Sequence, residues 1–97
     1  MKVVINGTCI NGIESGAKNR FRTIYNSIID QNPNIHFYIL EPKDYRLKKI
    51  INEKVNVSFI QTKCLSFFAF QRHLWSIFTI PKIIKKIKPD VYEQSHL

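Results

Sequence analysis

The chain has 97 residues, of which 44% are hydrophobic, and its 15 Lys and Arg against 7 Asp and Glu give a formal net charge of +8 at pH 7. This length fits one domain with a thin core and is short for a complete doubly wound domain. The charge favours an anionic partner, whether nucleic acid, acidic lipid headgroups or a phosphorylated small molecule. Cys9 and Cys64 show neither CxxC spacing nor a neighbouring His, which argues against a metal site, and polar residues interrupt the apolar stretch 65–81, which argues against a membrane span.

The N-terminal stretch predicts a buried strand, a glycine-bearing loop and an amphipathic helix. The run 3–5 is β-branched and continuous, which is typical of a strand covered on both faces at the centre of a parallel sheet. From Phe21, apolar residues recur at i, i+3, i+4, i+7 and i+8, along one face of a helix. Ser15 and Asn19 are the candidate caps of this helix, and the following proline predicts its end near Asn32.

Two more strands are predicted in the middle of the chain. Residues 35–40 are again almost continuously apolar, which favours a parallel βαβ unit with a right-handed crossover. Residues 43–54 carry apolar residues at helical spacing in a basic segment and predict a short surface helix. Alternation within residues 55–61 predicts a third strand, at an edge of the sheet or covered on one side only.

The C-terminal third predicts a basic amphipathic helix and a fourth strand. The helical pattern from Gln71 reaches Pro81, which either kinks the helix or occupies the first position of a new one. Beyond Pro81, isoleucines form an apolar stripe, and Pro89 ends the helix before a strand that starts near Val91. The other side of the helix carries four lysines, Lys82, Lys85, Lys86 and Lys88.

The loop after the first strand carries Gly7, Gly12 and Gly16, and its spacing can be compared with known phosphate-binding loops. The three glycines are too widely spread for the dinucleotide fingerprint GxGxxG. A Walker loop needs one more residue between the last two glycines, and a Ser or Thr after Lys18, where Asn19 stands. What remains is a longer loop of small residues whose amides, with the first turn of the helix, suit a phosphate group.

Three stretches, in this order, carry a family resemblance: INGTCINGIESGAKNRFRTIYNSII, then RHLWSIFTIPKIIKKIKPDV, then the closing SHL. They are similar to the glycine loop and first helix, and to the tryptophan, isoleucine-proline and basic helix leading into a strand, of the N-terminal domain of group 1 (GT4-like) GT-B glycosyltransferases. The resemblance covers essentially the whole chain. It implies an α/β fold with a Rossmann-like parallel sheet and flanking helices, the N-terminal half of a GT-B fold. Residues 1–97 would then be a single partial, acceptor-side domain without the donor-binding domain.

The resemblance implies transfer of a hexose from a nucleotide-diphosphate sugar to a glycan or a lipid-linked acceptor. Carried over by position, Gly16, Ala17 and Arg20 would bind the donor phosphates, and Gly12 and His96 would lie on the acceptor side. Members of the family hold the donor with a glutamate pair in the second domain, and this chain has no such pair. We therefore expect no activity from the chain alone, assign no catalytic residue, and expect neither a cofactor nor a metal.

The chain also departs from the family pattern, and simpler interpretations exist for most of these residues. Glu93 and Gln94 stand where His-Ser or a small residue is more usual. Gly12 and Gly16 can equally be turn glycines that need a positive φ. In the simpler interpretations Arg20 and His96 are solvated surface residues, His36 and His73 are structural, and Trp75 and Phe78 pack in the core or against another domain.

Two other classes of function compete with sugar transfer. In the first, the chain is a non-catalytic binding module or partner subunit at an anionic membrane surface, with Phe67, Phe68, Phe70 and the four lysines of the basic helix facing the lipid. With either function we expect a cytoplasmic protein, which membrane binding would make peripheral at the membrane. Nucleic-acid binding ranks last, because the aromatic residues fall on apolar positions of predicted helices and strands rather than on an exposed platform.

Overall fold

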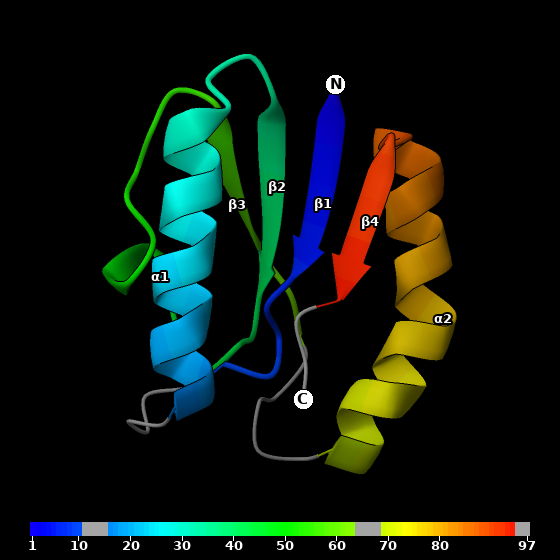
Figure 1. The fold of residues 1–97 in the computed structure, drawn as a ribbon. Helices are drawn as coiled ribbons and strands as arrows, with labels where there is room; N and C mark the ends of the chain where they lie inside the picture. The colour runs from blue at the N-terminus through cyan, green and yellow to red at the C-terminus, as the bar shows by residue number, and fades with distance from the viewer. Residues whose placement is uncertain (11–15, 64–68, 95–97) are drawn as a thin grey trace.

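The computed structural model describes residues 1–10, 16–63 and 69–94, and shows four parallel strands in one sheet with a helix on each face (Figure 1). The order across the sheet is β3-β2-β1-β4. The predicted α/β, Rossmann-like arrangement of a parallel sheet with flanking helices is therefore confirmed. The strands are β1 (Lys2–Asn6), β2 (His36–Glu41), β3 (Val57–Gln61) and β4 (Val91–Gln94), and the helices are α1 (Gly16–Gln31), the 3-10 helix η1 (Leu47–Lys49) and α2 (Ala69–Ile87).

Strand β1 lies in the interior of the sheet, as its continuous apolar run predicts. It pairs in parallel with β2, where Ile5 faces Ile39, and with β4, where Val3 faces Val91. Strand β3 pairs only with β2 and forms an edge, which agrees with its alternating sequence. From β1 the chain moves through α1 to β2 and then to β3, and α2 carries it back across the sheet to the other side of β1.

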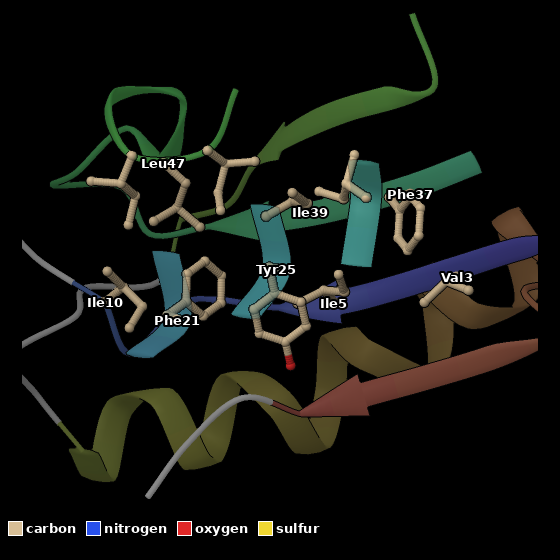
Figure 2. Packing of buried hydrophobic residues seen from close by; sticks show 11 residues of the cluster. Val3, Ile5, Ile10, Phe21, Tyr25, Phe37, Ile39 and Leu47 are labelled. Atoms are coloured by element: carbon tan, nitrogen blue, oxygen red, sulfur yellow. The ribbon is translucent and has the colours of Figure 1, made fainter. Parts of the chain in front are cut away.

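Alternate residues of the strands point into two separate cores. Val3 and Ile5 of β1 pack with α1, together with Phe37 of β2 (Figure 2). Val4 and Leu40, in contrast, pack with Ile80 and the isoleucine stripe of α2. Because successive side chains of a strand point to opposite faces, the two helices cover opposite faces of the sheet.

The two ends of α1 differ in how well the sequence predicts them. The helix begins at Gly16, so Asn19 lies inside it and the prediction that Asn19 is the cap is wrong; Ser15 lies outside the described residues. The Asn19 side chain instead accepts a hydrogen bond of 2.9 Å from Arg22. The C-terminal end falls at Gln31 as expected, and there the side chain of Asn32 donates to the Ile28 carbonyl at 2.7 Å.

The prediction of a surface helix over residues 43–54 is wrong. Only the single turn η1 forms, and Leu47, Ile50 and Ile51 are buried in the α1-side core. Long-range hydrogen bonds replace the helical ones: Asn26 of α1 donates to the Ile50 carbonyl at 2.8 Å and accepts from the Asn52 amide at 2.9 Å. The apolar spacing therefore marks buried residues in a turn fixed by α1.

Helix α2 is one continuous element that contains Pro81, so the alternative in which Pro81 starts a new helix is wrong. The ring of Pro81 is exposed, so water can bond the carbonyl of Ile77 that a proline leaves without its helical donor. The helix ends at Ile87, and Lys88 follows with φ 54°. Trp75 packs against the α2-side core, but Phe78 is 70% exposed, so the core interpretation of Phe78 is wrong.

Candidate functional site at the strand ends

The topology sets the place where a ligand would bind. On leaving β1 the chain turns to α1, whereas the neighbouring strand β4 is reached from α2 on the opposite face. In open parallel sheets ligands bind outside the carboxyl ends of the strands at such a switch point. The candidate site therefore lies along the edge of the sheet where the carboxyl ends of the strands lie, at the ends of β1 and β4. Helix α1 begins at this same edge (Figure 1).

Asn6 links the two strands at this edge. Its buried side-chain oxygen accepts hydrogen bonds from the Thr8 amide at 3.1 Å and from the Thr8 hydroxyl at 2.7 Å. Its side-chain nitrogen donates to the hydroxyl of Tyr92 in β4 at 3.0 Å. These bonds fix the turn that leaves β1 and hold β4 beside it. Burial raises the pKa of Tyr92, and the hydrogen bond from Asn6 partly opposes that rise.

Tyr25 connects α1 to the end of β4. Its ring is buried among the apolar side chains of the α1-side core (Figure 2), and its hydroxyl interacts with the Glu93 carboxylate. Burial is the main cause that raises the pKa of Tyr25, followed by the hydrogen bond and the charge of Glu93, and then by the neighbouring thiol of Cys9. Glu93, which departs from the family pattern, is therefore the partner of a helix side chain.

The ends of β2 and β3 are closed by a second buried group. The Glu41 carboxylate accepts a hydrogen bond of 2.8 Å from the Leu47 amide. The Glu41 carbonyl accepts two from Thr62, 3.0 Å from the amide and 2.8 Å from the hydroxyl. Glu41 occupies the strand-end position at which an acidic residue contacts ribose in dinucleotide-binding folds, but here it anchors η1.

The structure locates some of the predicted phosphate-binding residues. Gly16 and Arg20 are both exposed in the first part of α1, where they are open to a ligand, and Ala17 lies between them. A Cβ on Gly16 would meet no atom within 4 Å, so space does not require glycine at this position. Gly12 and His96 lie outside the described residues. The structure therefore brings Gly16, Ala17 and Arg20 to the same edge as Asn6 and Thr8.

A shallow hollow of about 330 Å³ opens at the same edge of the sheet, between the end of β3 and α2. Trp75 supplies an aromatic wall, Lys63 a positive charge, and Thr79 a hydroxyl. The other lining residues are Ile60, Gln61, Thr62 and Ile83. Together with the polar strand ends, this edge offers amide, hydroxyl and ammonium donors, which suit an anionic or hydroxyl-rich ligand.

Asn6, Tyr25 and Tyr92 belong to this edge although the sequence pattern does not predict them there. Asn6 carries the clearest local signal, because a polar residue directly after a buried run marks the end of a parallel strand. Tyr25 and Tyr92 give no such signal, since their aromatic rings fit an apolar pattern and their hydroxyl partners are distant in sequence.

In the part of the chain that the structure describes, no three residues among His, Cys, Asp and Glu gather closely enough to hold a metal ion. Among the described helices, none combines the length and the apolar character that crossing a membrane requires. No protein-family model, curated protein or solved structure matches this chain.

Proposed function

We propose that this chain is the acceptor-side part of a glycosyltransferase that moves a hexose from a nucleotide-diphosphate sugar to a glycan or a lipid-linked acceptor. The supporting observation is the switch point between β1 and β4, with the N-terminal turn of α1 at the same edge of the sheet. This arrangement suits a phosphorylated ligand, because the first amides of a helix carry partial positive charge. Gly12 and His96 are the proposed acceptor contacts.

The proposed chemical role of this domain is to stabilise the leaving diphosphate. Gly16 presents the start of a helix of 16 residues without a side chain in the way, and Arg20 adds an exposed guanidinium one turn later. Donors fixed where negative charge develops lower the barrier without any rearrangement during the reaction, and no metal is obligatory for this role. A second domain or a partner subunit would supply the remaining contacts to the nucleotide.

The test is a titration of the isotope-labelled chain with nucleotide-diphosphate sugars, followed by amide chemical shifts. We expect the amides of Thr8, Gly16, Ala17 and Arg20 to shift together. Arg20→Ala should weaken binding by roughly fivefold, the effect of one exposed charge contact of about 1 kcal/mol. Arg22→Ala is the matched control, since Arg22 is also exposed on α1 and carries the same charge. Equal losses from both variants would show that only the overall positive charge attracts the ligand.

A second candidate is a non-catalytic module at an anionic membrane surface. The observation that favours it is the exposure of Lys82, Lys85, Lys86 and Lys88 on and directly after α2. The two candidates are compatible, because a lipid-linked acceptor is presented at a membrane, and both place the protein peripherally there. An assay of sugar transfer by the chain combined with a donor-binding domain distinguishes the two candidates. The second candidate predicts no sugar transfer.

A further inference from the structure

Helix α2 exposes apolar side chains on the face that does not pack on the sheet. Leu74, Ile77 and Phe78 are 40%, 52% and 70% exposed, and their i, i+3, i+4 spacing places them together on one face. Ile80, one turn after Ile77, borders this row on the side that is buried against the sheet. Between residues 74 and 80, α2 therefore carries apolar side chains both where it packs on the sheet and where it is exposed.

The same outer face becomes basic in the C-terminal half of α2. Lys82 is one turn beyond Phe78, and Lys85 is two turns beyond it, so both extend the row of exposed apolar residues along the helix. Lys86 lies next to this row, and all three lysines are exposed. One helix of 19 residues thus offers an apolar patch followed directly by a cluster of positive charge.

We propose that this outer face of α2 inserts into the headgroup region of an anionic lipid bilayer. Leu74, Ile77 and Phe78 would enter the boundary between the headgroups and the acyl chains, and the lysines would contact lipid phosphates. This proposal rests on the membrane association proposed above and adds the inserted residues. It does not depend on sugar transfer.

The charge of the protein selects the bilayer over a second copy of the chain. Each copy carries a net charge of +8, so two copies that met through this face would repel each other. Three exposed side chains also supply much less area than the roughly 1,200–2,000 Å² that a stable protein interface buries. An anionic bilayer satisfies both halves of the face, because it offers an apolar layer directly below a layer of negative charge.

The test is flotation of the whole chain with vesicles of phosphatidylcholine and phosphatidylglycerol in equal parts, and with phosphatidylcholine alone. We expect binding only to the anionic vesicles. Phe78→Ser should reduce the partition coefficient about tenfold, since this ring is the largest and most exposed of the three side chains. Val55→Ser is the matched control, because Val55 is 99% exposed and lies outside α2; it should change binding less than twofold.

The lysines are tested with a second pair of variants. Replacement of Lys82, Lys85 and Lys86 by Gln should reduce binding about a hundredfold, at about fivefold for each lysine. Replacement of the exposed Lys43, Lys48 and Lys49 by Gln lowers the net charge equally and should have a much smaller effect. All variants are compared by thermal unfolding, and these exposed positions should leave it unchanged.

Three results would overturn the proposal. If the wild-type chain does not float with anionic vesicles, the outer face of α2 does not bind membranes. Salt-sensitive binding that Phe78→Ser leaves intact shows electrostatic association without insertion, so the proposed membrane association survives while the insertion does not. A dimer in the absence of lipid that Phe78→Ser dissociates assigns the face to a second copy.

Discussion

Gly7 is a glycine because of packing, and its replacement gives a direct measure of how tightly the end of β1 is built. An ideal Cβ at this position would lie 2.5 Å from Leu47 Cδ1, 3.1 Å from Phe21 Cζ and 3.2 Å from the Leu40 carbonyl oxygen. Leu47 is fully buried and Phe21 nearly so, and neither can move into solvent. The Leu40 carbonyl is fixed as well, since it accepts a hydrogen bond of 2.9 Å from the Gly7 amide.

Gly7→Ala should therefore destabilise the fold by about 1 to 2 kcal/mol. Overpacking of a buried site costs roughly 1–3 kcal/mol. Against this, alanine reduces the entropy of the unfolded chain, which stabilises the protein by about 0.4–1 kcal/mol. The net effect lowers the midpoint of thermal unfolding by about 4–8 °C for each kcal/mol in a domain of this size. Gly16→Ala is the control and should be neutral or stabilising, because nothing lies within 4 Å of its Cβ.

A double-mutant cycle with Leu47 tests the stated cause. Leu47→Ala alone should cost about 2–5 kcal/mol through the cavity that it leaves. It also removes the closest atom to the new Cβ, so Gly7→Ala in this background should cost at least 1 kcal/mol less than in the wild type. Urea unfolding followed by circular dichroism measures all four proteins. A coupling energy near zero would refute the packing argument, and so would a Gly7→Ala variant as stable as the Gly16→Ala control.

Four further predictions concern the edge of the sheet and the end of α2. The folded state raises the pKa of Tyr25 above its unfolded value of about 10, so its stabilising contribution should be complete below about pH 10 and fall as the pH rises further, as urea unfolding at pH 8 to 11 would show. Glu93→Gln should lower the pKa of Tyr25 in a tyrosinate absorbance titration, but not to the ordinary value, because burial persists; an unchanged titration would argue against the hydrogen bond. Tyr92→Phe removes the acceptor of the Asn6 amide and should cost about 0.5–1.5 kcal/mol, measured by urea unfolding, whereas no loss would mean that water replaces the hydroxyl. Lys88→Gly should raise the melting temperature, since a non-glycine residue at φ 54° costs about 1 kcal/mol, and a lower melting temperature would contradict this account.

The central strands could be predicted because burial on both faces leaves a signature in a single segment. Residues 3–5 and 35–40 are continuously apolar, and only a sheet covered on both sides by helices buries every residue of such a run. The signal for the end of α1 is equally local, since the proline after Asn32 disfavours helical geometry at the residue before it. Such patterns depend only on residues that are close together in the sequence, so they can be recognised without the structure.

The predictions that were wrong or missing share a different cause: these residues depend on partners that are distant in sequence. The turn around Leu47 looks helical in sequence, but Asn26, which bonds its backbone, lies 24 residues away from Ile50. Phe78 has the spacing of a core residue, yet α2 is apolar on two sides, and periodicity cannot tell which side the sheet covers. At the candidate site, Asn6 and Tyr92 are 86 residues apart, so only the fold brings them together.

The position of Glu93 bears on where a ligand could lie at the candidate site. A free carboxylate at the end of β4 would repel a diphosphate, and for that reason the departure from the family pattern counts against the proposal at first sight. In the structure this carboxylate interacts with Tyr25 of α1 and helps to raise the pKa of that tyrosine. Arg20 and the first amides of α1 supply positive charge at the same edge of the sheet. A phosphate at the start of α1 would thus meet these positive groups, while the Glu93 carboxylate is engaged with the hydroxyl of Tyr25.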